Sequence, residues 1–307
     1  MTLTQLGAFV LVARLGSVKA AAHALDVTEP AVSQALTALR HHLGDQLIVR
    51  SRNGMVLTKG GARLLPIASQ MVALGAEAEA EVRAAQGGPE ILRVVATSTI
   101  AEFVATPLID AFSRRAPRAI EATSGVAASS EMAVLVASRL SDLALGPYLG
   151  GDSGLLSEPI FRAQLVAVGA ARSSCATWLV DPSGTEPDSE TSRLLRRLRV
   201  PEDRIRVYPN QTAAWAAAAD GTGVALAFAH LVAHQIQRGE LSLIATPVTP
   251  AEIRWHATTL SADRRPPLAG ALRRFLGTPE AMHLMRAPGV GIPPSRFRPP
   301  VHVTIWS

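Results

Sequence analysis

The stretch covering residues 26–47 carries side chains that can recognise nucleic-acid bases. It reads DVTEPAVSQALTALRHHLGDQL. Thr28 is a suitable N-cap for a helix, and Pro30 fits the first helical turn, where its missing N–H costs no hydrogen bond. Glutamine can hold adenine with two hydrogen bonds, and proline can touch a thymine methyl group. The first turn and a half of this helix presents Thr28, Glu29, Pro30, Ser33 and Gln34.

Glu29 is unexpected if this helix meets DNA, because phosphate groups repel a carboxylate. In the first turn of a helix, however, a carboxylate complements the helix dipole by about 0.3–1 kcal/mol. A glutamate that faces base edges can also accept a hydrogen bond from the cytosine amino group. We therefore expect Glu29 to weaken non-specific binding to DNA and to favour a cytosine at one position of the site.

Two further helices would support this one. The first has an apolar face spaced at helical intervals, and Gly16 ends it. Ser17 then caps a short second helix with a face of small residues. The third helix runs from Thr28 to about His42, and Gly44 ends it. The residues of the first apolar face are Leu3, Leu6, Phe9, Val10 and Ala13.

A predicted β-hairpin follows the third helix. The segments QLIVR and GMVLT alternate like two strands, and SRN forms the turn between them. Arg50 and Arg52 lie in this hairpin, where a guanidinium group can reach phosphate or the narrow minor groove. Residues 1–63 carry seven basic and three acidic side chains, out of a net charge of +5 for the whole chain. Three helices and a hairpin are the plan of a winged helix-turn-helix.

The same segment resembles the N-terminal domain of LysR-type transcriptional regulators. The matching pieces are a phenylalanine in the first helix, then G-S-x-x-x-A-A, L-x-V-[S/T]-x-P-A-V-S, L-x-x-L, L-G, L-[F/I]-x-R and L-T-x-x-G, in order and at the family's spacing. The resemblance implies that residues 1–58 bind double-stranded DNA. The family often has glutamine where Glu29 stands and arginine where Gln34 stands, so this helix is less basic than usual.

Residues 59–86 have the pattern of one long helix that Thr58 would cap. Apolar residues recur at alternating steps of three and four, which is typical of a coiled-coil seam. Pro66 and Gly75 lie inside the helix, and we expect a kink or loosening near each. The alternative is an ordinary core helix. The resemblance favours dimerisation through 59–88, and the seam consists of Leu64, Ile67, Met71, Leu74 and Ala78.

From residue 89 onward, short apolar runs alternate with helical stretches, which indicates parallel sheets covered by helices in an α/β fold. The resemblance implies a two-lobed effector-binding domain like a periplasmic binding protein, spanning 89–287. Lobe one would comprise 91–160 plus 265–287, and lobe two 161–264, with crossings near Pro159 and Asp263. The tail, 288–307, has no counterpart in the family pattern.

An effector site is expected between the lobes. Ser98 and Thr99 stand where a helix begins at about Ile100, and the free N–H groups and hydroxyls there suit a carboxylate. Simple capping by Ser98 is the alternative. We therefore expect a small, anionic effector. Ser124, at the end of the next strand, is a weaker candidate. The resemblance adds Gly146, Tyr148, Asn210, Gln211 and Thr212.

The sequence gives little support to catalysis or metal binding. It contains no G-x-S-x-G, P-loop or G-x-G-x-x-G motif. His230 and His234 are four residues apart, but a zinc site lacks a third ligand. We predict no catalytic residue, cofactor or metal. A single cysteine, Cys175, excludes an internal disulfide. We also expect no signal peptide and no membrane span, and therefore a cytoplasmic protein.

The sequence as a whole predicts a homo-oligomeric DNA-binding regulator. Two recognition helices related by a two-fold axis would read an inverted repeat, and dimers can pair into tetramers. A small effector would change this binding, and RNA polymerase is a further candidate partner. The alternative is a soluble α/β ligand-binding or catalytic protein whose helical N-terminal segment is an adaptor for protein contacts.

Overall fold

The N-terminal helices form where their caps predict. The computed structural model describes residues 1–51, 54–150, 154–171 and 177–287. The helix α1 (Leu3–Leu15) ends at Gly16, whose φ is +66°, and α3 (Glu29–Leu43) ends at Gly44, whose φ is +65°. The Ser17 hydroxyl caps α2 (Val18–Ala24), and the Thr28 hydroxyl caps α3 by accepting from the Ala31 amide. These four predicted helix boundaries are confirmed.

The hairpin is fixed to α3 and to the next helix by polar contacts. The strands β1 (Ile48–Ser51) and β2 (Gly54–Leu57) pair antiparallel. Arg40 on α3 donates to the carbonyls of Gln46 (2.8 Å) and Ile48 (3.0 Å). The Asp45 carboxylate accepts from the Leu47 amide and the Thr58 hydroxyl, and both bonds lower its pKa. Sequence reasoning did not identify Arg40 as the residue that positions the hairpin.

The long helix α4 (Lys59–Ala85) is continuous through Pro66 and Gly75. The Thr58 hydroxyl accepts from the Gly61 amide and caps it, as predicted. One face packs on α1, with Gly75 leaving room for the Leu3 side chain. Of the predicted seam, Leu64 is half-buried against the helix-turn-helix core. The other seam residues, Ile67, Met71, Leu74 and Ala78, are exposed.

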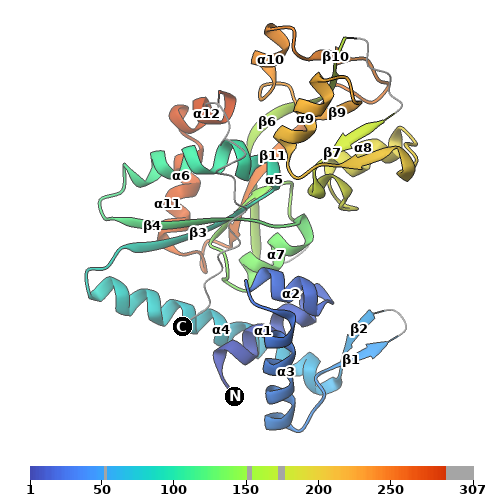
Figure 1. The fold of residues 1–307 in the computed structure, drawn as a ribbon. Helices are drawn as coiled ribbons and strands as arrows, with labels where there is room; N and C mark the ends of the chain where they lie inside the picture. The colour runs from blue at the N-terminus through green and yellow to red at the C-terminus, as the bar shows by residue number, and fades with distance from the viewer. Residues whose placement is uncertain (52–53, 151–153, 172–176, 288–307) are drawn as a thin grey trace.

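A single mixed sheet runs through both lobes (Figure 1). Its order is β4-β3-β5-β11-β6-β9-β7-β8, with β10 beside β6. The parallel pairs are β3 with β4, β3 with β5, β7 with β8 and β7 with β9, whereas β6 and β11 run antiparallel to their neighbours. The strands are β3 Glu90–Ala96, β4 Ile120–Val126, β5 Leu143–Gly146, β6 Leu155–Gly169, β7 Trp178–Val180, β8 Ile205–Val207, β9 Val224–Phe228, β10 Ser242–Ile244 and β11 Ala251–Leu260.

The two lobes share β6 and β11. These strands pair from Leu155 with Leu260 to Leu165 with Ala251, with an irregularity between Trp255 and His256. Residues 256–258 pair with β5 of lobe one, whereas residues 165–168 of β6 pair with β9 of lobe two. The second crossing therefore lies earlier than the position near Asp263 suggested by the sequence, because β11 continues past the crossing as a strand of lobe one.

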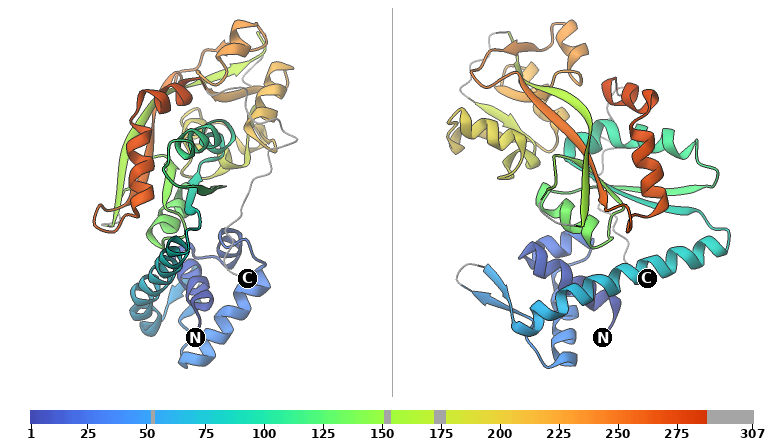
Figure 2. Two further views of the ribbon diagram at one scale, coloured as in Figure 1. Left: turned by 90° about the vertical axis from the view of Figure 1, so that its left-hand side faces the viewer. Right: turned by 180° about the vertical axis from the view of Figure 1, so that it is seen from behind.

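Helices cover both lobes (Figures 1 and 2). An aromatic stack of Phe103 on Trp215, with centroids 5.1 Å apart, packs lobe one against lobe two. The helices of lobe one are α5 Ser98–Ile100, a π-helical segment Ala101–Ala105, α6 Thr106–Ser113, α7 Ser129–Ala137, α11 Pro267–Leu276 and α12 Pro279–Arg286. Those of lobe two are a 3₁₀ turn Pro182–Thr185, α8 Glu190–Arg197, a 3₁₀ turn Glu202–Arg204, α9 Gln211–Ala219 and α10 Ala233–Gln237.

His230 belongs to an aromatic cluster. Its ring lies 5.1 Å from that of Phe161 and 5.5 Å from that of Trp255, and burial lowers its pKa to about 4. It is therefore neutral at physiological pH. No group of side chains suited to a metal occurs among the described residues. None of the helices in the described ranges is long and apolar enough to cross a membrane.

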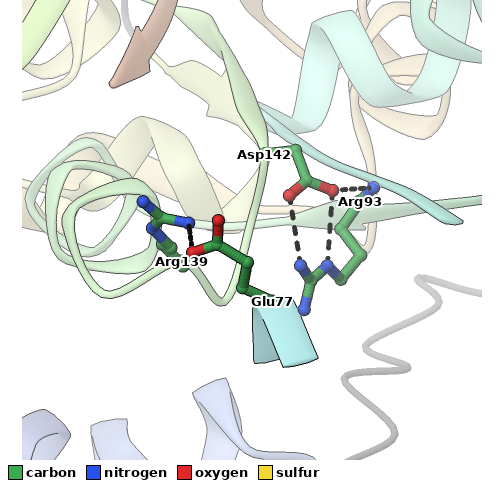
Figure 3. Close-up of polar contacts among 4 residues, drawn as sticks. All are labelled: Glu77, Arg93, Arg139 and Asp142. Atoms are coloured by element: carbon green, nitrogen blue, oxygen red, sulfur yellow. Dashed lines mark hydrogen bonds and ion pairs between the residues drawn. The ribbon is translucent and has the colours of Figure 1, made fainter. Parts of the chain in front are cut away.

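Lobe one contacts the DNA-binding domain and α4 directly. Figure 3 shows the polar contacts in this region. The carboxylate of Glu77 on α4 accepts at 2.9 Å from the guanidinium group of Arg139, which lies just after α7. Beside it, Asp142 accepts from the Arg93 guanidinium at 3.1 and 3.3 Å and from the Arg93 amide at 2.8 Å. In addition, α1 packs on α7. The second pair lies within lobe one, where it joins β3 to the residue that precedes the neighbouring strand β5.

We expect Asp142→Asn to destabilise the protein far more than Glu77→Gln. Asp142 is buried and holds three hydrogen bonds, so its loss leaves Arg93 without its charge partner, at a cost of about 1–3 kcal/mol. Glu77 is half-exposed, and its ion pair contributes at most about 1 kcal/mol. Urea unfolding of both variants measures the difference, and equal losses would contradict this assignment.

Candidate functional site

The first turns of α3 form an exposed polar surface. Val32, Leu36 and Leu39 are buried and fix the opposite face of the helix against α1 and α2. All five predicted base-reading residues are exposed: Thr28, Glu29, Pro30, Ser33 and Gln34. Of these side chains, that of Thr28 caps the helix by accepting from the Ala31 amide. Glu29 is the first residue of the helix, where the carboxylate meets the positive end of the dipole.

The hairpin lies beside α3 and extends the exposed surface (Figure 1). Arg50 on β1 is exposed. Arg52 lies outside the described residues. Since Arg40 ties α3 to the hairpin, a movement of one carries the other. An exposed helix N-terminus beside a basic hairpin can enter a major groove while the hairpin contacts the flanking backbone.

A second candidate site lies between the lobes. It is a cavity of about 80 Å³, and three of the predicted effector residues line it: Thr99, Gly146 and Gln211. Its apolar wall includes Trp215, Phe228 and Trp255, from lobe two and the crossing strand. Its polar lining consists of Thr97, Thr99, Ser129, Ser183, Glu186, Ser189, Glu190, Thr191, Gln211 and Arg254.

Two residues predicted to bind the effector form hydrogen bonds with carboxylates of the protein itself. The Ser98 hydroxyl, in lobe one, donates to the carboxylate of Asp181, in lobe two. The Thr212 hydroxyl, in lobe two, donates to the carboxylate of Glu102, in lobe one, and the Thr212 amide lies 3.3 Å from the same oxygen. The Ser98 hydroxyl, the Thr212 hydroxyl and the Thr212 amide are therefore each bound to a carboxylate of the opposite lobe. Ser98 does not cap its helix, whose N-cap is Thr97.

The remaining predicted residues have structural roles or lie elsewhere. Asn210 caps α9 by accepting from the Ala213 amide at 2.8 Å. The Gln211 side chain donates to the Leu226 carbonyl at 2.9 Å. Tyr148 is exposed, and its ring packs edge-on against His256, outside the lining of the cavity. Ser124 lines a different cavity, between lobe one, α4 and the helix-turn-helix.

Sequence reasoning missed the carboxylates at the cleft. Burial raises the pKa of Glu102, against the hydrogen bonds from Thr212, and nearby Asp181 raises it further. Burial also raises the pKa of Glu186 to about 7, and the carboxylates of Glu131 and Asp181 add to the rise. One available signal was the position of Asp181 directly after the buried strand β7, at the edge where parallel strands present ligand-binding side chains.

Two family descriptions match this chain. Residues 3–62 match the bacterial regulatory helix-turn-helix protein, LysR family, and residues 85–278 match the LysR substrate binding domain. The chain is 34% identical over its whole length to the HTH-type transcriptional regulator Rv0377 of Mycobacterium tuberculosis, which it covers completely. It is 27% identical to the regulator CfxR of Cupriavidus necator, over 96% of this chain and 97% of CfxR.

Solved structures share the fold. The ArgP structure from Mycobacterium tuberculosis has a TM-score of 0.56 at 20% identity, over 89% of this chain and 95% of ArgP. Full-length LysG from Corynebacterium glutamicum, with its bound effector Arg, has a TM-score of 0.51 at 19% identity, over 90% of this chain and 97% of LysG. These structures show the shared fold, and the two family matches with the 34% identical relative establish the class of the protein. The chain belongs to the LysR family of DNA-binding transcriptional regulators, with an effector-binding domain, and is not an enzyme.

Proposed function

We propose that this regulator binds an inverted-repeat operator as a homo-oligomer, and that a small molecule in the interlobe cleft controls the binding. The observation that carries the proposal is the exposed N-terminal turn of α3, whose polar residues have no packing role beyond the Thr28 cap. Glu29, Ser33 and Gln34 would bind base edges, and Pro30 would contact a thymine methyl group. Arg50 and Arg52 would bind the phosphate backbone of the DNA.

Dimerisation through α4 is the second part of the proposal. Ile67, Met71, Leu74 and Ala78 form an exposed apolar row on a helix whose other face packs on α1. Val82, also exposed, extends this row. Such an apolar row on a helix whose opposite face packs on α1 supports the binding of a partner helix. A two-fold dimer places two α3 helices on one face, as an inverted repeat requires.

The effector cleft links binding to transcription. A ligand that favours one arrangement of the lobes would shift the spacing of the DNA-binding domains, since lobe one contacts α1 and α4. If the DNA-bound protein activates a promoter, RNA polymerase would be a further partner. A protein that binds chromosomal DNA in a bacterium would be located in the cytoplasm. The Ser98 and Thr212 hydroxyls, expected to bind a carboxylate of the effector, donate to Asp181 and Glu102 instead, so the proposed function does not include a negative charge on the effector.

Footprinting upstream of the protein's own gene and across the genome tests the proposal. We expect a protected dyad whose affinity falls with rising salt, because phosphate contacts release counterions. Glu29→Gln should raise the overall affinity for DNA about threefold to tenfold, by removing repulsion from phosphates. It should also relax the preference for one symmetric base pair. Glu202→Gln, an exposed position in lobe two with the same change of charge, is the matched control.

Two results of the footprinting would count against this function. A complete lack of a salt-sensitive dyad would remove the proposed operator binding. Unchanged affinity and base preference in Glu29→Gln would leave Glu29 with only its role at the helix N-terminus.

Leu74→Glu tests the seam on α4. Leu74 is 63% exposed in the single chain, so the substitution leaves the fold intact. In the dimer it would bury a carboxylate in an apolar contact, and we expect monomers in sedimentation velocity. Gln70→Glu adds the same charge at an exposed position beside the seam and should remain dimeric. A Leu74→Glu protein that sediments as the wild type would show that the chains associate elsewhere.

A further inference from the structure

Two acidic residues from each lobe meet at the cleft. Lobe one contributes Glu102, from the π-helical segment, and Glu131, from the first turn of α7. Lobe two contributes Asp181, after β7, and Glu186, after the 3₁₀ turn. Burial raises the pKa of both Glu102 and Glu186, and a carboxylate of the opposite lobe, Asp181 for Glu102 and Glu131 for Glu186, raises it further. Closing the lobes therefore concentrates negative charge.

One of these carboxylates lacks a full set of partners. Glu102 is 2% exposed, and its Oε1 accepts from Thr212. Its Oε2 is buried and has no hydrogen-bond partner among the described residues. A buried carboxylate oxygen without a donor is costly, and proteins retain such groups mostly at functional sites. Glu102 lies outside the lining of the cavity, so this atom marks an incompletely paired carboxylate at the contact between the lobes.

Basic residues do not neutralise the cluster. In the described part of the chain, none of the ion pairs includes Glu102, Glu131, Asp181 or Glu186. Arg254 is the only basic residue in the described lining of the cavity. Its side chain is 57% exposed, and its guanidinium lies 3.4 Å from the carboxylate of Glu252 on the same strand. The cleft keeps a negative balance.

The cavity wall suits a positive charge as well. Trp215, Phe228 and Trp255 line it together with Glu186. Aromatic faces attract a cation through the ring quadrupole, most strongly where water is excluded. Hydroxyl groups around the cavity, such as those of Thr99 and Ser129, can accept hydrogen bonds from an N–H donor. A volume of about 80 Å³ is small for a ligand pocket, which favours a compact group.

We propose that the interlobe cleft binds a small cationic effector, whose ammonium or guanidinium group lies between Glu186 and the aromatic wall. This inference rests on the proposed function of the cleft as the effector site. The cation offsets the repulsion between the carboxylates of the two lobes and thereby stabilises the closed arrangement. Because it interacts with the closed form more strongly than with the open form, it shifts the population of the regulator.

The pH dependence of binding follows from Glu186. Its pKa in the folded protein, about 7, lies above the ordinary 4.5, so ionising it costs the closed form stability as the pH rises from 4.5 toward 7. A bound cation recovers this loss because it favours the ionised carboxylate. The affinity for a cation should therefore increase from about pH 6 to about pH 8.

The test uses the full chain and three probes matched in size: n-butylammonium, methylguanidinium and butanoate. Each is titrated at constant ionic strength while the melting temperature and the heat of binding are recorded. We expect both cations to raise the melting temperature and butanoate to leave it unchanged. Glu186→Gln should weaken binding of the cations about tenfold, which corresponds to one unit of pKa coupling. Glu202→Gln should bind them like the wild type.

Several outcomes would overturn the proposal: stabilisation by butanoate instead of the cations, no binding of either cation, or full affinity in Glu186→Gln. If Glu186→Gln does not fold, wild-type affinity that is equal at pH 6 and pH 8 would overturn it equally. Footprinting in the same samples separates the two claims. A protected operator without cation binding would contradict only the proposed positive charge of the effector. Cation binding without any protected operator would contradict the proposed function.

Discussion

Two reciprocal contacts between a carboxylate and a hydroxyl group hold the effector domain closed. Asp181 of lobe two accepts from Ser98 of lobe one, and Glu102 of lobe one accepts from Thr212 of lobe two. Since β6 and β11 are continuous through both lobes, the lobes can separate only by bending these strands near their irregularity. The position of lobe two therefore depends on these polar contacts in the cleft, together with the Phe103–Trp215 stack between the lobes.

The cleft is connected to the DNA-binding surface through lobe one. The helix α7 begins at the cleft, where Ser129 lines the cavity, and its other end leads to Arg139 and the ion pair with α4. The same helix packs on α1. Because α1, α3 and the hairpin share one core and Arg40 ties α3 to the hairpin, the DNA-binding domain moves as a unit. A change at the cleft thus has a continuous packed route to α3.

The parts of the fold that depend on local chemistry were predictable from the sequence. Caps such as Thr28 and end points such as Gly44 follow from short-range rules, and the single long helix α4 follows from the spacing of its apolar residues. The second crossing between the lobes was misplaced, because strand pairing across more than ninety residues, as between Leu155 and Leu260, leaves no local signal.

The candidate site was predictable only in part, for a related reason. The start of a helix predicts free N–H groups, and Thr99 and Gln211, predicted as effector contacts, line the cavity between the lobes. The sequence did not indicate which group would fill those positions. Glu102 lies in an apolar helical segment and Asp181 in a segment rich in proline and glycine, and only the folded chain brings each against the opposite lobe.

The claim that charge at the cleft controls closure is tested most directly by a distance across it. Spin labels at Ser130→Cys of lobe one and Arg197→Cys of lobe two, in a Cys175→Ser background diluted with unlabelled chains, report the separation of the lobes by pulsed electron resonance. The account predicts one short distance at about pH 6, a growing population of longer distances at about pH 8 as Glu186 ionises, and recovery of the short distance with n-butylammonium. A distribution that changes with neither pH nor the cation would contradict it.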